Sequence, residues 1–392
     1  METENHNQPR FHYLVIGAGR QGTASAYDLC KFGEAQSLIL ADQNIALAQH
    51  AAERVNRLLG KDIVQSEHVD AANASAVNSL MKGQTAVLSA IPYYYNLALT
   101  ELAIENHCHY CDMGGNTDVV QQQLALNEKA SQAGVSVIPD CGMGPGLINN
   151  MGAYALTLLD EVSEIIIYDA GLPQKMEPPW YYQSTFNLNG LTNEMDGKSV
   201  VLRNGEIAYI DTLSEPELVH IPNIGVFEAD LIAGGASTAP WSFKGKVKHY
   251  ENKTMRHPKH WEWMRAYKAL GLFSEQPIQL KEGMVTPREV FHTLLAKNIN
   301  ADHIQDMAII QVKVVGMKND IITTLFILLI DYYDKASGFT AMERLTGWHC
   351  AITMGFQATG VILPGAKPIE IAIAPKMIMD AFTKRGIEHK VF

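Results

Sequence analysis

The chain has 392 residues, of which 47% are hydrophobic, and a formal net charge of −11. A chain of this length and composition buries more than one core, so we expect a globular protein of two domains. The acidic balance excludes a nucleic-acid partner, because phosphate backbones require clustered Lys and Arg. The five cysteines are too scattered for a disulfide framework, which favours a reducing cytoplasm. The most apolar run, Ile321 to Ile330, is too short to span a membrane and predicts a buried strand.

The first part of the chain alternates short β-prone runs with longer helical patterns. In chain order the β-prone runs are FHYLVIG, SLILAD, TAVLSAI, CHYCDM and VSVIPD, separated by helical patterns that end at Phe32, Leu59, Asn106 and Ala133. Strands separated by helices of that length predict a doubly wound parallel sheet, the Rossmann form of the α/β class. We expect this Rossmann domain to cover residues 1–148.

The sequence changes character after residue 148. Short strands such as EIIIYDAG and MAIIQVKVVG now mix with aromatic-rich loops, which predicts a second, α+β domain over residues 149–338. Helical patterns return over residues 339–392, and we expect these C-terminal helices to pack back on the Rossmann domain. The long apolar strands of the second domain also predict a homodimer or a higher homo-oligomer, since a second copy would cover them.

The segment YLVIGAGRQG joins the first predicted strand to the first predicted helix. In that context the pattern GxGxxG is typical of a dinucleotide-binding loop. Gly17 allows the tight turn, Gly19 lets the backbone approach a pyrophosphate, and Gly22 lets the helix lie close to the sheet. The N-terminus of the helix then offers free N–H groups to the phosphates. The alternative is a glycine-containing turn that binds nothing.

The second predicted strand ends in Asp42, 20 residues after Gly22. A carboxylate at this place accepts hydrogen bonds from both ribose hydroxyls and repels a ribose phosphate, so the expected cofactor is NAD rather than NADP. Arg20 is a further cofactor-binding candidate, and its guanidinium would instead favour the extra phosphate of NADP. The alternative for Asp42 is an incidental acid at a strand end.

The residues Ile91, Pro92 and Tyr93 follow the strand TAVLSAI, at the edge where such sheets bind ligands. They predict a wall beside the nicotinamide. A proline that ends the strand, followed by core aromatic residues, is the alternative. Cys108 and Cys111 have the spacing of half a zinc site, but no second pair follows, so we expect no metal.

Several segments together resemble one protein family. They are VIGAGRQG, IPYYYN, CDMGGN, IPDCGMGPGLIN, AGLPQKMEPPWYYQSTFNLNGL, NKTMRHPKH and TAMERLTG, in this order over nearly the whole chain. The sequence resembles the saccharopine dehydrogenase-like family, and within it the lysine 6-dehydrogenase branch. The resemblance implies a Rossmann domain, an inserted substrate domain and NAD-dependent oxidation at a carbon that bears an amino group. For this branch it implies oxidative deamination of the lysine side chain to an aminoadipate semialdehyde, which closes to a cyclic imine.

Such a reaction requires an anchor for the substrate carboxylate. Arg256, in TMRHP, is the first candidate, because a guanidinium binds a carboxylate through two parallel bonds and the matching family segment supplies an arginine. A solvated surface arginine is the alternative. His257 is a candidate substrate contact, although a structural bond is the favoured interpretation. Gly144, Pro145 and Gly146 precede a helix whose first turn offers N–H groups to an anion, or they form a domain hinge.

Proton transfer requires a polar group near the reacting amine. Asp112, at the end of the strand CHYCDM, is a catalytic candidate, and stabilisation of the following glycine turn is the alternative. Tyr182 matches a tyrosine of the lysine-deaminating relatives and is the second catalytic candidate. The sequence departs from those relatives at Tyr181 and Ser184, where an acidic residue and a histidine are expected. Tyr181 would line a site for a cation or an apolar chain, or pack at a domain interface.

We therefore expect an NAD-dependent oxidoreductase that acts on the CH–NH or CH–NH2 group of an amino acid, with lysine as the first substrate to consider and Arg256 as the residue that positions it. Three alternatives stay open. A saccharopine dehydrogenase would require further cations, for which Lys253 and Arg203 are the candidates. A carboxyspermidine-type reductase would join a diamine to a semialdehyde and would usually use NADP. A non-catalytic NAD-binding sensor would keep the fold alone.

Overall fold

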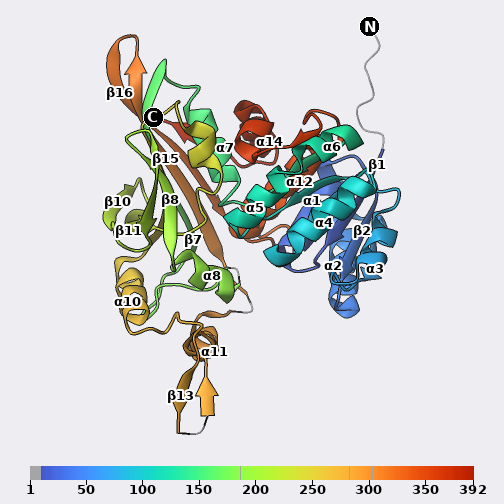
Figure 1. The fold of residues 1–392 in the computed structure, drawn as a ribbon, viewed down its shortest axis with the longest axis horizontal. Coiled ribbons are helices and arrows are strands. Elements are labelled where there is room, and N and C mark those ends of the chain that lie inside the picture. Colours follow the sequence, from blue (N-terminus) through green and yellow to red (C-terminus); the bar gives the residue numbers. More distant parts are fainter. Residues whose placement is uncertain (1–9, 186, 282, 302) are drawn as a thin grey trace. The chain divides into compact units, whose positions relative to one another are not determined.

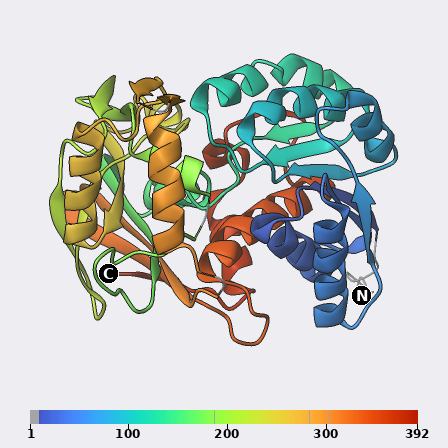
Figure 2. The same ribbon diagram turned by 90° about the horizontal axis from the view of Figure 1, so that it is seen from below.

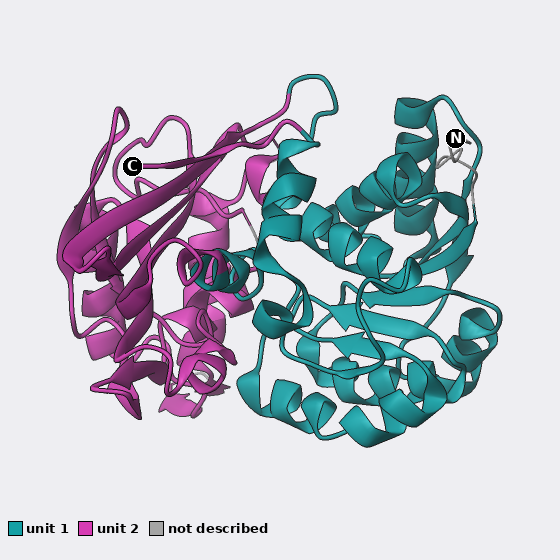
Figure 3. Cartoon of the chain, turned by 90° about the horizontal axis from the view of Figure 1, so that it is seen from above, with its two compact units in different colours: residues 1–153, 335–339, 343–385 teal, residues 154–334, 340–342, 386–392 magenta. Residues whose placement is uncertain are grey.

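The structure is a computed structural model that describes residues 10–185, 187–281, 283–301 and 303–392. The chain forms two compact units, coloured separately in Figure 3. Unit 1 comprises residues 1–153, 335–339 and 343–385, and unit 2 comprises residues 154–334, 340–342 and 386–392. The chain therefore enters unit 2 at residue 154, against a predicted border after 148, and its C-terminal segment is shared between the units.

Unit 1 is built on a sheet that has seven strands in the described residues, and every pairing in it is parallel. The strand order is β17-β6-β5-β4-β1-β2-β3, which is the doubly wound order with one strand added at the edge. The predicted Rossmann α/β fold is thus confirmed. The strands are β1 (Phe11–Ile16), β2 (Ala35–Asp42), β3 (Val64–His68), β4 (Ala86–Ser89), β5 (His109–Asp112), β6 (Ser136–Ile138) and β17 (Gly365–Ala366).

Helices cover both faces of this sheet, as Figure 2 shows with the blue helices on one side and the teal helices on the other. The helices of the first 155 residues are α1 (Arg20–Phe32), α2 (Ile45–Leu59), α3 (Ala74–Met81), the 3-10 turn η1 (Tyr93–Tyr95), α4 (Asn96–Glu105), α5 (Thr117–Leu124), α6 (Asn127–Ala133) and α7 (Leu147–Ala155). The sequence analysis missed β3 and α3, because the strand VQSEH is mostly polar and lies at the sheet edge.

The C-terminal helices are α12 (Ala341–Ala358), α13 (Ile369–Ala372) and α14 (Pro375–Thr383). Within unit 1, α12 packs closely on α1: the Ser25 hydroxyl donates to the Gly347 carbonyl at 2.8 Å. A Cβ atom at Gly347 would lie 2.8 Å from the Gln21 carbonyl oxygen, so glycine is what permits this approach. A segment more than 300 residues away in sequence therefore supports the helix that follows the glycine loop.

Unit 2 is built on a mixed sheet, which has nine strands in the described residues. The order is β10-β11-β12-β7-β15-β16-β18, with β8 paired to β12 and β9 to β8, and β7 and β12 are parallel neighbours. This sheet with its helices confirms the predicted second α+β domain. The strands are β7 (Glu161–Pro173), β8 (Lys198–Arg203), β9 (Glu206–Asp211), β10 (Glu217–Ile221), β11 (Gly225–Leu231), β12 (His249–Arg256), β15 (Asp306–Lys318), β16 (Ile321–Tyr332) and β18 (His389–Val391). A separate hairpin consists of β13 (Ile278–Leu280) and β14 (Gly283–Val285).

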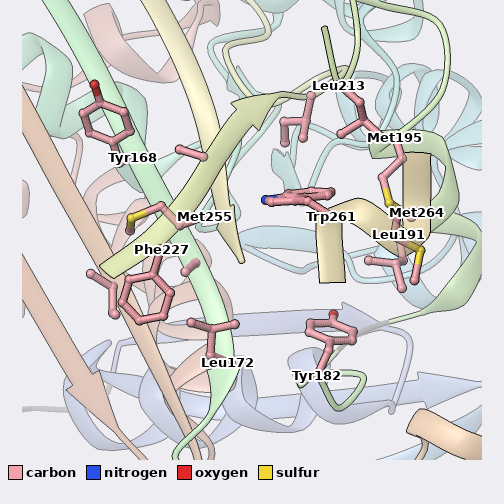
Figure 4. Packing of buried hydrophobic residues seen from close by; sticks show 14 of the residues in the cluster. Tyr168, Leu172, Tyr182, Leu191, Met195, Leu213, Phe227, Met255, Trp261 and Met264 are labelled. Carbon is pink, nitrogen blue, oxygen red and sulfur yellow. The ribbon is translucent and has the colours of Figure 1, made fainter. Parts of the chain in front are cut away.

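Buried residues of the sheet and its helices form the core of unit 2, part of which is shown in Figure 4. Alternate residues of a strand point to the same face, so Tyr168 and Leu172 of β7 join Phe227 of β11 in one cluster. Trp261 and Met264 enter the cluster from α10. The helices of unit 2 are α8 (Leu188–Glu194), α9 (Ala239–Phe243), α10 (Pro258–Ala269) and α11 (Pro287–Ile299), shown in Figure 1. The core therefore ties strands β7 and β11 to helix α10.

The predicted buried strand from Ile321 to Ile330 forms as β16, but its beginning is not buried. Ile321 and Ile322 are 67% and 78% exposed, whereas Ile327 and Leu329 are fully buried. The exposed residues follow the turn at Asn319 and Asp320, so they lie at the tip of the β15–β16 hairpin rather than in the core. Among the described residues, no helix is both long enough and apolar enough to cross a membrane.

Phe227 tests the core of unit 2, because it is only 2% exposed. Phe227→Ala removes the ring and leaves a cavity, and we expect the free energy of unfolding to fall by about 3–5 kcal/mol. The measurement is urea denaturation of the variant beside the wild type. Tyr209, which is 60% exposed on β9, provides the control: Tyr209→Ala should change the free energy by less than about 0.5 kcal/mol. Equal losses in the two variants would contradict this description of the core.

Candidate functional site

The loop between β1 and α1 has two glycines that no other residue can replace. Gly17 has a φ of 107°, and a Cβ atom there would lie 2.5 Å from the Ala90 carbonyl oxygen. A Cβ atom at Gly22 would collide with the Gly17 carbonyl oxygen. Gly19 differs, because no heavy atom lies within 4 Å of the position its Cβ would take. The backbone at Gly19 is therefore open to a ligand at the N-terminus of α1.

Asp42, the last residue of β2, is held beside this loop. Its Oδ2 accepts the Ala18 N–H at 2.8 Å, and its Oδ1 accepts the Asn44 N–H at 2.8 Å. The residue stays partly exposed. An open helix N-terminus with a carboxylate at the end of the second strand fits the diphosphate and ribose of a nicotinamide dinucleotide. Arg20 is exposed at the first position of α1, and its contact with the cofactor stays a prediction.

The residues that follow β4 lie against the glycine loop. The Ile91 side chain would be 2.9 Å from a Cβ atom placed at Gly17, so the two loops touch. Pro92 precedes the turn η1, and the Tyr93 side chain would lie 3.3 Å from a Cβ atom at Gly115. The carboxyl ends of β1, β4 and β5 thus meet in one place, which is where an open α/β sheet binds its ligand. A role of these three residues at the nicotinamide stays a prediction.

Asp112, at the end of β5, is fully buried, and its hydrogen bonds stabilise the surrounding loops. Its Oδ1 accepts the Gly114 N–H at 2.8 Å and the Asp140 N–H at 3.2 Å, and its Oδ2 accepts the Gln123 amide at 2.6 Å. Burial raises the pKa of Asp112 above its usual value. These contacts support the alternative we gave, a carboxylate that holds a glycine turn, while a direct catalytic role stays a prediction.

The turn before α7 does not offer the bare N–H groups that the sequence led us to expect. The Leu147 N–H donates to the Gly142 carbonyl at 2.9 Å, and the Ile148 N–H donates to the Met143 carbonyl at 3.0 Å. Gly146, with a φ of 131°, folds the chain back on itself so that these bonds form. The expectation of an anion site in the first turn of α7 was therefore wrong. Substrate contact by Gly144, Pro145 and Gly146 themselves stays a prediction.

Unit 2 holds the second group of candidate residues, around the end of β12. Arg256 is only 2% exposed, and its guanidinium lies 5.0 Å from the ring centre of Tyr182 and 5.8 Å from that of Trp261. Its one hydrogen bond to a described residue goes from Nη1 to the Met255 carbonyl at 3.0 Å. Its Nε is buried without a partner, and no carboxylate oxygen of the described residues lies within 4.0 Å of the guanidinium. Arg256 is thus a buried cation rather than the solvated surface arginine of the alternative interpretation.

Two carboxyl groups lie in the electrostatic surroundings of Arg256. Asp169 of β7 is 7% exposed, and its Oδ1 accepts the Asn252 amide at 2.7 Å and the Thr254 hydroxyl at 3.3 Å. Glu194, the last residue of α8, is half-buried, and its carboxyl group bonds to no described residue. Burial raises the pKa of Asp169 and raises that of Glu194 to about 8, although the positive charge of Arg256 lowers both.

His260 and Tyr182 bring neutral polar groups to the same place. Their ring centres are 4.9 Å apart, and His260 Nδ1 donates to the Trp180 carbonyl at 3.2 Å, which leaves Nε2 as an acceptor without a partner among the described residues. Burial and the nearby Arg256 lower the pKa of His260 to about 3. Burial raises the pKa of Tyr182. Both side chains are therefore uncharged near neutral pH.

His257 and Tyr181 form a stacked pair at the edge of this group. Their ring centres are 3.9 Å apart with an angle of 6° between the planes. His257 Nδ1 accepts the Lys259 N–H at 3.3 Å and so caps α10, which supports the structural interpretation of this histidine. The backbone N–H of Ser184 donates to the Ile299 carbonyl at 2.9 Å, and the residue is 6% exposed. Tyr181 and His257 stay predicted substrate contacts.

The two further cations named in the sequence analysis, Arg203 of β8 and Lys253 of β12, form ion pairs. Arg203 forms ion pairs with Glu215 at 2.6 Å and with Glu251. Lys253, which is 5% exposed, forms one with Glu217 at 2.7 Å. Among the described residues these two cations are neutralised, whereas Arg256 has no ion pair.

Sequence reasoning missed Asp169, Glu194 and His260. Asp169 carried a signal, since it is an acid inside the apolar strand EIIIYDAG. Glu194 lies in the polar stretch TNEMDGK and His260 beside a helix start, where such residues are common on the surface. No pattern in the sequence distinguishes them, because their burial depends on strands from elsewhere in the chain. The described residues contain no cluster of three or more His, Cys, Asp or Glu side chains arranged to hold a metal ion.

Models of known domains match most of the chain. The saccharopine dehydrogenase NADP binding domain matches residues 13–138, and the saccharopine dehydrogenase C-terminal domain matches residues 142–387. The chain belongs to the saccharopine dehydrogenase family. It is thus an NAD(P)-dependent oxidoreductase of that family, as the resemblance implied at this coarser level.

Individual relatives agree with the family and differ from the lysine branch. Saccharopine dehydrogenase (L-Glu forming) of Saccharomyces cerevisiae has the same fold, with a TM-score of 0.79, over 98% of this chain and 100% of that chain at 16% identity. Carboxynorspermidine synthase of Vibrio cholerae is 23% identical over 305 residues, 72% of each chain. Carboxyaminopropylagmatine dehydrogenase of Synechocystis is 24% identical over 221 residues, 54% of each chain.

The glycine loop of this family member gives a direct test of the cofactor site. In Gly22→Ala the new methyl group would push α1 away from the loop, and we expect the affinity for both NAD and NADP to fall by at least about tenfold. Calorimetric titration measures this. Gly355, in α12, has nothing within 4 Å of its Cβ position, so Gly355→Ala should leave the affinity unchanged. Unaltered binding by Gly22→Ala would argue against the proposed position of the diphosphate.

Proposed function

We propose that this protein is a reductase that joins an amine to the aldehyde of an amino acid and forms a secondary amine with a carboxyl-bearing arm. The names of the two relatives, carboxynorspermidine synthase and carboxyaminopropylagmatine dehydrogenase, describe products of this kind. The proposal corresponds to the carboxyspermidine-type alternative, and it replaces lysine deamination as the leading hypothesis.

The charge balance of the buried site is the observation that carries the proposal. The site has one unpaired cation, Arg256, and two carboxyl groups, Asp169 and Glu194, beside aromatic rings. Its complement is a ligand that carries a carboxylate and at least one ammonium group. Carboxylated polyamines have this composition. The aromatic faces of Tyr182 and Trp261 give apolar contacts to the methylene chain.

Saccharopine fits the site less well, because it carries three carboxylates. The additional cations that it would require, Arg203 and Lys253, are occupied by Glu215, Glu251 and Glu217. Breaking the pair of Arg203 with Glu251 to bind a ligand would leave Glu251, whose side chain is only 3% exposed, without this cation, which is costly. This difference supports a substrate with a single carboxylate.

Lysine also carries one carboxylate and an ammonium group beside it, so it stays the second candidate. The departures at Tyr181 and Ser184 speak against it, since lysine-deaminating relatives are expected to have an acid and a histidine there. Instead, Tyr181 stacks on the ring of His257 and Ser184 is buried, so neither position carries the expected acid or histidine. The assay below separates lysine from a condensation substrate.

The reaction has two stages. A primary amine adds to the aldehyde and loses one water to give an imine, and hydride addition to the imine carbon with protonation of nitrogen gives the secondary amine. A bound reduced nicotinamide supplies the hydride. In unit 2, Arg256 would hold the carboxylate. The neutral His260 offers its Nε2 as an acceptor to an attacking amine, and the neutral Tyr182 can donate a hydrogen bond but cannot act as a base near pH 7.

The decisive experiment follows the absorbance of reduced nicotinamide. We expect consumption of NADH or NADPH when the protein is mixed with diaminopropane or agmatine and an amino acid that ends in an aldehyde. Lysine with NAD and saccharopine with NAD are run in parallel. Reduction of NAD with lysine alone would favour the deaminase, and reduction with saccharopine would favour that dehydrogenase. Cofactor binding without turnover of any substrate would favour a sensor.

The choice of cofactor depends on Asp42. We propose a preference for NADH, because the Asp42 carboxylate beside Gly19 repels the extra phosphate of NADPH. The domain model that matches this region is described as NADP binding, whereas the carboxylate of Asp42 favours NAD. Asp42→Ala should weaken NAD binding by about tenfold and strengthen NADP relative to NAD, measured by calorimetry. An unchanged ratio of the two affinities would contradict the proposed role. Asp70→Ala, on an exposed turn of the same unit, serves as the control.

A further inference from the structure

The separation of opposite charges around Arg256 is unusual for a buried cluster. A buried arginine normally forms an ion pair, because an unpaired charge costs several kcal/mol. Here the guanidinium has acids in its electrostatic surroundings, yet no carboxylate oxygen of the described residues lies within 4.0 Å. A guanidinium without an ion pair among the described residues is able to pair with the carboxylate of a ligand.

We propose that Arg256, Glu194 and Asp169 together bind the α-amino and α-carboxylate groups of the amino acid aldehyde, with Arg256 holding the carboxylate and the two acids holding the ammonium. This inference rests on the proposed function and names the substrate group that the site selects. It assigns a specificity role to Glu194 and Asp169, which the sequence did not single out.

Arg256 is shaped to receive a carboxylate. Its buried Nε has no hydrogen-bond partner in the part of the chain that the structure describes, and the Met255 carbonyl accepts from Nη1 on the other side of the fork. The rings of Tyr182 and Trp261 lie against the guanidinium and restrict its movement. A planar fork that is held in place and has free donors binds a carboxylate through two parallel bonds.

Glu194 is held in place through its backbone rather than its carboxyl group. The Ala233 N–H donates to the Glu194 carbonyl at 2.8 Å. On either side, Arg288 donates to the Asn193 side chain at 3.0 Å and Lys268 donates to the Met195 carbonyl at 2.9 Å. The end of α8 is therefore fixed, while the carboxyl group bonds to no described residue. A positioned acid without a partner is suited to an incoming ammonium group.

Asp169 is also oriented by the fold. Asn252 and Thr254, both on the neighbouring strand β12, donate to its Oδ1. Its Oδ2 makes no hydrogen bond to another described side chain. Thr254 and Arg256 point to the same side of β12, since alternate residues share a face. Asp169 is therefore positioned on the side of the sheet from which Arg256 extends.

The protonation of the acids adds a measurable consequence. Burial and the neighbouring Asp169 raise the pKa of Glu194 to about 8, against the lowering effect of Arg256, so Glu194 holds a proton at pH 7 in the empty site. An ammonium ion beside it favours the carboxylate and lowers that pKa. Binding of an α-amino acid should therefore release a proton at pH 7. Besides these groups, the neutral Tyr182 faces Glu194, and from α11 His292 bonds to Thr192.

Simple probes test the inference without any catalysis. We expect L-α-aminobutyrate to bind at least about tenfold more tightly than butyrate, which lacks the ammonium, and than propylamine, which lacks the carboxylate. Calorimetry in two buffers of different ionisation enthalpy should show proton release with L-α-aminobutyrate at pH 7. In Glu194→Gln both the preference over butyrate and the proton release should be lost, with butyrate binding unchanged. Asp169→Asn should reduce the preference and keep the Asn252 contact.

The matched control is Glu262→Gln, an exposed acid on α10, which should behave as the wild type. Thermal unfolding of each variant establishes that it is folded before titration. Equal binding of L-α-aminobutyrate and butyrate by the wild type would overturn the inference, as would a retained preference in folded Glu194→Gln, or tighter binding of diaminopropane than of L-α-aminobutyrate. A protein that binds the probes as expected but reduces no imine would contradict the proposed function and leave this site intact.

Discussion

A buried guanidinium that has no ion pair with any described residue is the constraint on which unit 2 depends. Moving a charge out of water costs several kcal/mol unless other groups replace its hydration. At Arg256 the replacement is partial: one backbone carbonyl, two aromatic faces and two acids that stay beyond ion-pair distance. The remaining attraction is available to a ligand. In the proposed function, the stability lost at this point corresponds to strong binding of an anionic group.

Strand β12 carries both paired charges and a charge without an ion pair among the described residues. At the beginning and middle of β12, Glu251 and Lys253 belong to a network with Arg203 and Glu217 in which the charges satisfy one another. Burial would raise the pKa of Glu251, but His249, Lys253 and Arg203 together lower it. At the end of β12, Arg256 lacks such partners among the described residues. Strand β12 thus carries Lys253, which belongs to a network of ion pairs. Arg256, three residues further on, has no ion pair with a described residue.

The cofactor loop in unit 1 is governed by sterics rather than by charge. The carbonyl oxygens of Ala90 and Gly17 occupy the space where side chains at positions 17 and 22 would lie, while the space at Gly19 is open. These are backbone requirements, and they leave a recognisable pattern of residues in the sequence. For that reason the loop, the strand that precedes it and Asp42 could all be predicted, and the parallel sheet followed from the alternation of strands and helices.

The sequence by itself determined the fold class, the cofactor loop and the family, because glycine spacing, strand alternation and local motifs are properties of neighbouring residues. The tertiary structure decided which polar residues form the site. Asp112 is buried and accepts backbone hydrogen bonds, and the N–H groups at the start of α7 donate to carbonyls of the preceding turn. Asp169, Glu194 and His260 lie in the electrostatic surroundings of Arg256. Burial and pairing of a charge depend on segments far apart in the chain, and such long-range contacts have no local pattern in the sequence.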